Sequence, residues 1–235
     1  MDTAADIAAP VDRFNGLVED LLNKVNSALD WVLWGLGWVV DKIHDAWNSL
    51  MDKITEVFEP LVFILSNLGS PSTVTSTGDA WSSHVGAPVS ARVGTAEPGA
   101  LAVDDSWKGS AATQYGQQVP RQKTALQGIK TQFTDGISSA LKDVANAIQF
   151  FFGAMEVAIA AWIAAIIAAL ASSATIIGIP AGILIAVGAG AAFGAAFWGA
   201  GENLKSQCRA AKSLLEQRLA ENIGYPGGSW PQATL

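Results

Sequence analysis

The sequence predicts an all-α protein, a long antiparallel helical hairpin or bundle that continues into a two-helix apolar hairpin. Three observations support this class. Apolar residues recur at spacings of three and four over long stretches, which is the period of an amphipathic helix. Between residues 147 and 200 lie two apolar runs long enough to cross a bilayer. Glycine, proline and serine gather at a few places and separate these stretches.

The first predicted element is a long, acidic, amphipathic helix over residues 1–68. Its apolar stripe runs from Phe14 to Leu61 in steps of three and four. Such a length must lie against another long helix or break once, because ordinary globular helices are much shorter. Gly35 and Gly37 are the expected break, since an interior glycine costs about 1 kcal/mol in a helix.

Within this helix, residues 29–40 are rich in tryptophan and apolar nearly all round. One interpretation is a deeply buried contact between helices. The other is an interfacial belt, because indole rings prefer the boundary between lipid headgroups and acyl chains. The three indoles belong to Trp31, Trp34 and Trp38.

Residues 69–109 are dominated by glycine, serine, threonine and proline and are predicted to form a loop. This loop ends in the Trp107-Lys108-Gly109 turn. A loop of this length is longer than packing requires, which usually indicates function or mobility. A second long amphipathic helix is expected over residues 110–146, capped by Ser106 or Ser110.

Residues 147–200 are predicted to form an apolar helical hairpin with a turn over 172–180. A run of about 24 apolar residues suffices to cross a hydrocarbon layer about 30 Å thick. Glu156 is the one charged residue of the hairpin. It lies either near the membrane interface or on the lumen of an oligomeric channel, because a carboxylate deep in lipid is costly. Residues 201–235 are expected to form a C-terminal amphipathic helix and tail.

Small residues recur at every fourth position of the second apolar arm. This spacing lets two helix backbones approach closely in lipid. The partner of this ridge is either the first arm of the same hairpin or a neighbouring chain. The stripe consists of Gly182, Ala186, Gly190 and Gly194.

A register follows from the equal rise of all helices. If residue 67 lies opposite residue 110, residues 31–40 lie opposite about residues 137–146. Three tryptophans would then meet three phenylalanines where the bundle enters the bilayer, and together they would form an aromatic girdle. The phenylalanines are Phe150, Phe151 and Phe152.

Composition argues against several functions. The net charge is −7 with a sequence pI of about 4.7, so nucleic-acid binding is not expected. One cysteine, Cys208, and two histidines, His44 and His84, leave too few groups for a disulfide framework or a structural zinc site. No nucleophile, base and acid set can be assembled. We therefore expect no enzyme, metal or cofactor, and no cleaved signal peptide at the N-terminus.

A family resemblance lies in the segment Val103-Asp-Asp-Ser-Trp-Lys-Gly-Ser-Ala-Ala112 and continues through Pro120-Arg121-Gln122. It resembles the Trp-x-Gly proteins associated with actinobacterial type VII (ESX) secretion, over about residues 79–150. The resemblance implies a helical hairpin whose turn carries Trp107 and Gly109. Physical reasoning agrees, because glycine permits a tight turn and an indole can plug the open end of a helix pair.

The chain departs from the small members of that family in its apolar hairpin, its long connection and its lack of a Tyr-x-x-x-Asp/Glu signal. In layout it is also similar to helical pore-forming toxins. The resulting hypothesis is a membrane-inserting protein of a type VII system, an anchor or a self-assembling pore. Its partners would be the lipid bilayer and either further copies or another helical-hairpin secretion protein. The alternative is a soluble export substrate or adaptor whose apolar hairpin stays shielded until delivery.

Overall fold

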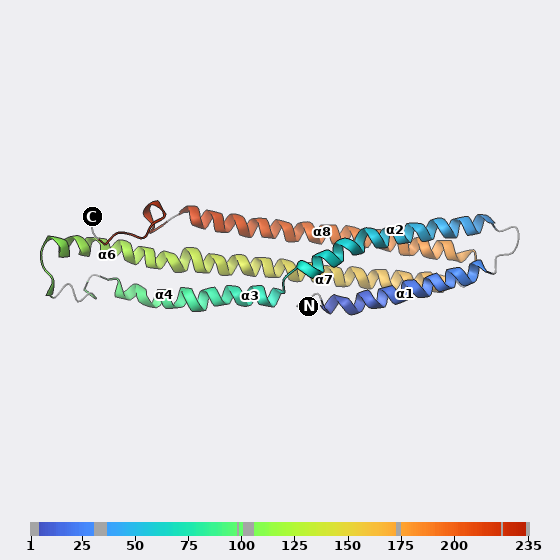
Figure 1. Ribbon diagram of the computed structural model, residues 1–235, viewed down its shortest axis with the longest axis horizontal. Coiled ribbons are helices and arrows are strands. Elements are labelled where there is room, and N and C mark those ends of the chain that lie inside the picture. The colour runs from blue at the N-terminus through green and yellow to red at the C-terminus, as the bar shows by residue number, and fades with distance from the viewer. Residues whose placement is uncertain are drawn as a thin grey trace. The chain divides into compact units, whose positions relative to one another are not determined.

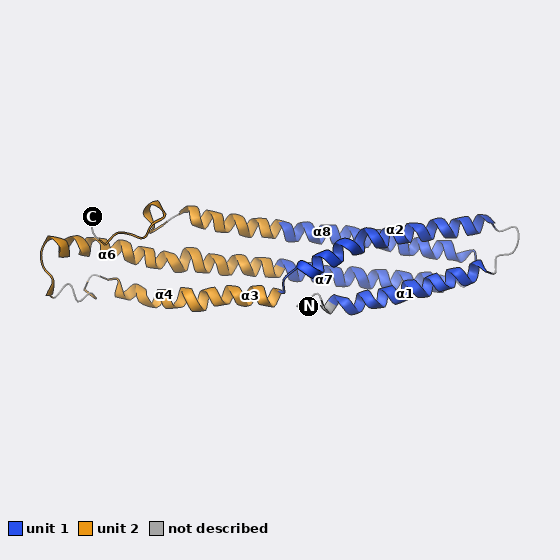
Figure 2. Cartoon of the chain, viewed as in Figure 1, with its two compact units in different colours: residues 1–70, 147–205 blue, residues 71–146, 206–235 orange. Residues whose placement is uncertain are grey.

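The computed structural model describes residues 5–30, 37–97, 99–100, 106–172, 175–221 and 223–233. Every regular element in this described part is helical, so the predicted all-α class is confirmed. The chain forms two compact units (Figure 2). Unit 1 contains residues 1–70 and 147–205, and unit 2 contains residues 71–146 and 206–235. Two helices, α7 (Asp135–Ser172) and α8 (Gly178–Glu221), contribute residues to both units.

Unit 1 is a four-helix arrangement (Figure 1). It combines α1 (Ala5–Leu29) and α2 (Gly37–Asn67) with the apolar parts of α7 and α8. The rings of Phe14 in α1 and Trp162 in α7 lie 4.6 Å apart, and the Lys24 ammonium donates a hydrogen bond of 2.9 Å to the Leu170 carbonyl. These contacts make α1 parallel to α7.

The predicted antiparallel pairing of the N-terminal stripe with residues 110–146 is wrong. In unit 1, Trp38 borders Leu184 in a small pocket, and Val57 faces Gly194, so α2 runs alongside α8. The physical reason is that a heptad stripe predicts which face of a helix is buried but does not predict which other helix packs against that face. The apolar hairpin offers more apolar surface to bury than residues 110–146 do.

Unit 2 is built on two antiparallel helical arms together with the last part of α8, from residue 206 onward (Figure 2). The first arm contains α3 (Pro71–Ala80), the π-helical segment η1 (Trp81–Gly86), α4 (Ala87–Arg92) and the 3₁₀ turn η2 (Val93–Thr95). The second arm contains α6 (Ser110–Gly128), the π-helical segment η3 (Ile129–Thr134) and the start of α7. The Lys142 ammonium pairs with Asp79 at 2.9 Å, and Lys123 pairs with Glu97, which sets the antiparallel register.

The prediction of a loop over residues 69–109 is wrong for residues 71–95, which are helical. Their small residues serve close packing instead of turns. A Cβ on Gly78 would lie 3.2 Å from the Ser138 carbonyl oxygen, and one on Gly86 would lie 2.5 Å from Thr134 Oγ1. Tertiary contacts of this kind override low intrinsic helix propensity.

The predicted boundaries at residues 146 and 200 also differ from the structure. Both fall inside continuous helices, because α7 joins the amphipathic stretch to the first apolar arm and α8 joins the second arm to the C-terminal stretch. Pro120 lies inside α6 and does not end it. The predicted break near residues 35–37 falls next to α2, which begins at Gly37, while residues 31–36 lie outside the described part.

Candidate functional site

Two helical stretches are long and apolar enough, by length and composition, to cross a membrane. They are Ser110–Ser172 and Gly178–Glu221, with mean hydropathies of 2.2 and 1.9 in their most apolar windows. Only 39% and 33% of the residues in those windows are buried within the protein. The apolar hairpin therefore has a covered side and an open side.

The covered side centres on Trp162, whose side chain is fully buried. Its indole ring lies 4.6 Å from Phe14, 5.9 Å from Phe58 and 5.4 Å from Phe193, so it joins α1, α2 and α8 to α7. The indole Nε1 donates a hydrogen bond of 2.8 Å to the Ala186 carbonyl oxygen. The Trp162 ring is thus packed against apolar side chains, and its one hydrogen-bond donor has an acceptor.

The small-residue stripe of α8 packs inside its own chain. A Cβ on Gly182 would collide with the Ser172 hydroxyl and would lie 2.9 Å from the Ala169 carbonyl oxygen. A Cβ on Gly190 would lie 2.6 Å from Trp162 Cζ2. Ala186 is buried beside the same indole, and Gly194 faces Val57 of α2 at 3.7 Å. The stripe thus packs on the first arm of the same hairpin, which was one of the two predicted partners. It also contacts α2.

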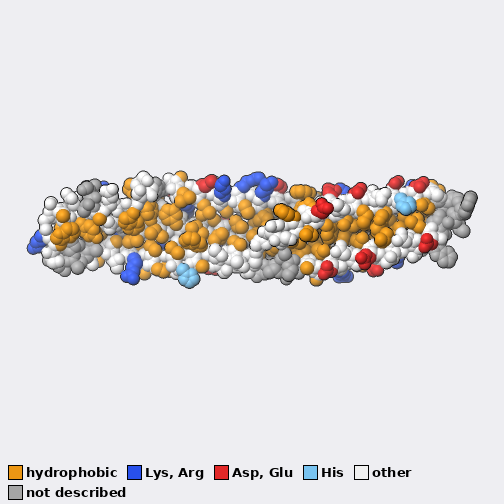
Figure 3. All heavy atoms as spheres, viewed as in Figure 1, with side chains coloured by type: hydrophobic (Ala, Val, Ile, Leu, Met, Phe, Trp, Pro, Cys, Tyr) orange, Lys and Arg blue, Asp and Glu red, His pale blue; other side chains and the backbone are white. Residues whose placement is uncertain are grey.

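The open side of the hairpin carries large apolar side chains. Figure 3 views unit 1 from the side of α2, and on that face hydrophobic side chains fill the middle while acidic and basic side chains lie along the edges. Large apolar side chains exposed on one hairpin are typical of a segment that meets lipid or another protein. The exposed large side chains of this hairpin are Phe150, Val157, Ile167, Ile177, Leu184, Ile185 and Trp198.

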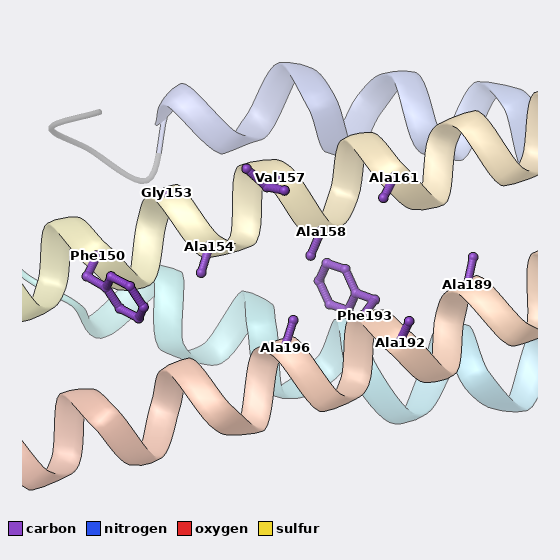
Figure 4. A pocket seen from close by; sticks show the side chains of 10 residues that line it. All are labelled: Phe150, Gly153, Ala154, Val157, Ala158, Ala161, Ala189, Ala192, Phe193 and Ala196. Atoms are coloured by element: carbon purple, nitrogen blue, oxygen red, sulfur yellow. The ribbon is translucent and has the colours of Figure 1, made fainter.

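A groove of about 610 Å³ lies between α7 and α8 on unit 1 (Figure 4). Ala158 of α7 and Ala192 of α8 face each other across it, and Phe193 lies between them with 2% of its surface exposed. Every residue that lines the groove is apolar or glycine. The lining consists of Phe150, Gly153, Ala154, Val157, Ala158, Ala161, Ala189, Ala192, Phe193 and Ala196.

Glu156 is exposed and borders a second groove of about 500 Å³, between α1 and α7. Arg13 of α1 lines the same groove, whose other walls include Ile163 and Ile167. A carboxylate and a guanidinium thus stand at one apolar depression without forming an ion pair. Sequence reasoning did not find Arg13, because residues so far apart in the chain carry no pattern that links them.

Among the described residues the predicted aromatic girdle does not form. Phe151 and Phe152 are fully buried, Phe151 lies 6.0 Å from Phe197, and Phe150 is exposed. Trp38 is exposed at the other end of the hairpin, beside Ile177, with the Lys42 ammonium 5.1 Å from its ring centroid. The different pairing of α2 is the cause. The other two predicted girdle residues, Trp31 and Trp34, lie outside the described residues.

The turn residues lie between the two arms of unit 2. Gly109 has φ of +113° and ψ of −179°, a conformation essentially restricted to glycine. Trp107 is 45% exposed and its ring lies 5.9 Å from Tyr115 of α6. The expectation that this indole plugs the open end of the helix pair is therefore wrong, because it lies against one helix and remains half open to solvent.

The C-terminal segment of unit 2 contains a residue that sequence reasoning missed. Tyr225 donates a hydrogen bond of 2.8 Å from its hydroxyl to the Ala125 carbonyl oxygen, and its ring contacts Phe133 and Trp230. Desolvation by burial raises the pKa of Tyr225 above its usual value of 10.0. An aromatic residue just after a glycine was the available sequence signal, but it is too common to be informative.

Compared with family models, with curated protein sequences and with solved structures, the chain matches none of them.

Proposed function

We propose that this chain is a non-enzymatic, membrane-inserting helical protein and that residues 147–200 are the inserting element. The observation that carries the proposal is the two-sided hairpin. One side packs on α1 and α2 through the ring contacts of Trp162, and the other side exposes apolar side chains. Glu156 is the one charged residue among residues 147–200. The free energy of such an apolar surface falls when lipid replaces the water around it.

Release of the α1 and α2 cover is the step that would let the hairpin enter a bilayer. In the compact form, Phe14 and Phe58 supply the rings that cover Trp162. In lipid, Trp162 and Phe193 would remain paired, because they lie on the two arms of the hairpin itself. The charge-poor tip favours insertion, since no ionised group has to cross the hydrocarbon layer.

A disulfide that holds the cover in place tests this proposal. Val57 of α2 and Gly194 of α8 are close enough to be replaced by cysteines, since a Cβ on Gly194 would lie 3.7 Å from Val57 Cγ2. The variant Val57→Cys, Gly194→Cys would be made with Cys208→Ser, which removes the exposed native thiol. We expect the reduced form to enter phosphatidylcholine vesicles and resist carbonate extraction, and the oxidised form to stay in solution.

The same protein before oxidation is the matched control. Equal insertion of the oxidised and reduced forms would show that the cover does not control entry. Failure of the parent chain to enter vesicles at all would favour the soluble alternative below. Dye-loaded vesicles then distinguish the two membrane roles, since a pore releases the dye and an anchor does not.

An association with a type VII secretion system is part of the proposal. It is supported by the Asp-Asp-x-Trp-x-Gly segment and by the place of Trp107 and Gly109 between two antiparallel helical arms. The second candidate is a soluble export substrate or adaptor with a shielded hairpin, and the covering of Trp162 by α1 and α2 favours it. Fractionation of host cells into membrane, cytosol and medium separates these candidates.

A further inference from the structure

We propose that the groove between α7 and α8 on unit 1 binds one acyl chain of a bilayer lipid. This inference rests on the membrane-inserting function proposed above and identifies the lipid contact of the same hairpin. The lipid is oriented with its headgroup at the end of the groove that lies nearest residues 202–205.

The chemistry of the groove selects the occupant. None of its ten lining side chains carries a hydrogen-bonding group. A polar ligand would lose its hydrogen bonds to water there and receive none in return, which costs several kcal/mol in an apolar site. A hydrocarbon chain has no such requirement, because it carries no polar group that needs a partner. The walls fit a slender chain, because seven of the lining residues are glycine or alanine.

The size of the groove agrees with a single chain. Along α7 it extends from Phe150 to Ala161, which at 1.5 Å per residue is about 17 Å. One leaflet of a bilayer has a hydrocarbon depth of about 15 Å, half of the usual 30 Å. The groove volume of about 610 Å³ also lies within the range of small-molecule pockets. The groove can therefore hold one lipid chain along its length.

Polarity differs between the two ends of the groove and sets the direction of the lipid. Towards the hairpin tip the exposed side chains of α8 stay apolar, as at Leu184 and Ile185. Past Ala196 the helix becomes polar, because Asn203 follows two turns later and Lys205 pairs with Glu202 at 3.0 Å. A headgroup thus meets polar side chains at this end, and the chain methyl points to the tip.

A helix of a second copy is the other occupant to consider. A helix measures about 10 Å across with its side chains. Val157 is 69% exposed where it lines the groove, so a helix would rest on it, whereas one hydrocarbon chain can reach the nearly buried Phe193. The observations favour the lipid chain.

The test uses the full chain with vesicles of phosphatidylcholine in which a small fraction carries a photoreactive diazirine in one acyl chain. Flotation measures membrane insertion, and mass spectrometry maps the adducts. The test variant is Ala192→Leu, which fills the groove. The matched control is Ala195→Leu, because both alanines are exposed on α8 and only Ala192 lines the groove. Circular dichroism melts verify that both variants fold.

We expect the parent adducts to concentrate on residues 150–161 and 189–196. Ala192→Leu should lose them while still floating with vesicles, and Ala195→Leu should keep them. Adducts spread evenly over the hairpin, or unchanged in Ala192→Leu, would overturn the groove proposal and leave the proposed function standing. A parent chain that floats with vesicles but carries no adducts at the groove residues would also overturn it.

The outcomes for a chain that does not float are equally decisive. Absence of both flotation and adducts would overturn the proposed function and the groove together. Groove adducts without flotation would support the groove and overturn membrane insertion.

Discussion

Unit 1 and unit 2 are both helical, but they differ in the polarity of the side chains that they bury. In unit 1 the helices meet through aromatic rings around Trp162, and no polar side chain is buried in its described part. In unit 2 they meet through small residues and ion pairs such as Lys142 with Asp79. The buried polar side chains of the described residues all belong to unit 2, namely Gln118, Gln132, Thr134 and Ser138.

This difference indicates which unit is better suited to move from water into lipid. Ring contacts and apolar burial do not depend on water, so the hairpin of unit 1 can keep its internal packing in lipid, where Glu156 is its one charged group. Ion pairs and buried amides would be costly there. In the insertion proposed above, unit 2 would therefore stay in water.

Trp162→Ala should destabilise the protein by about 3 to 5 kcal/mol, because it removes a fully buried ring and leaves a cavity between four helices. Chemical denaturation followed by circular dichroism measures the change. The control is Trp198→Ala, at a ring that is 58% exposed, with an expected effect within about 0.5 kcal/mol. Similar losses in both variants would mean that the aromatic cluster is not the centre of unit 1.

Gly190→Leu should cost about 1 to 3 kcal/mol, since its Cβ would lie 2.6 Å from Trp162 Cζ2 and the indole would have to move. Gly188→Leu is matched in chemistry but has open space around the added Cβ. There the better helix propensity of leucine should raise stability by up to about 1 kcal/mol. Thermal melts compare the two, and a tolerated Gly190→Leu would contradict the close packing of α7 with α8.

Gly109→Ala should destabilise unit 2 by about 1 to 3 kcal/mol, because φ of +113° is strained for any side chain. Gly116→Ala in α6 is the comparison, with open space at its Cβ and an expected gain of about 0.5 to 1 kcal/mol. Hydrogen exchange of unit 2 amides reports the effect locally. Equal protection in the two variants would show that the turn does not require glycine.

Tyr225→Phe should cost about 1 kcal/mol, because it removes the hydrogen bond to the Ala125 carbonyl and leaves that oxygen without this donor. The pKa of Tyr225 is raised, so its contribution is fully present below pH 10 and is lost as the pH rises through the folded-state pKa. The difference in stability between parent and variant should therefore shrink above pH 10. Denaturant titrations at several pH values measure it, and a constant difference would contradict the docking of this hydroxyl.

Several features of the protein were predictable from the sequence alone. The period of three and four identified helices, and the charge-poor run from residue 147 to 200 identified the apolar hairpin, because both depend on local composition. The glycine at position 109 was expected at a turn, and the structure gives it a glycine-only conformation. Small residues at every fourth position predicted close helix packing in lipid, and in the structure Gly182 and Gly190 lie against α7.

The tertiary structure alone decided which helices pair. Residues 71–95 have the composition of a loop, yet they are helical because Gly78 and Gly86 let the first arm of unit 2 approach the second closely. The apolar stripe of α2 packs along α8, and this pairing places Trp38 near the hairpin tip instead of beside Phe150. The physical reason is that a sequence pattern fixes the period and polarity of each helix face, whereas pairing depends on the surfaces that all helices offer one another at once.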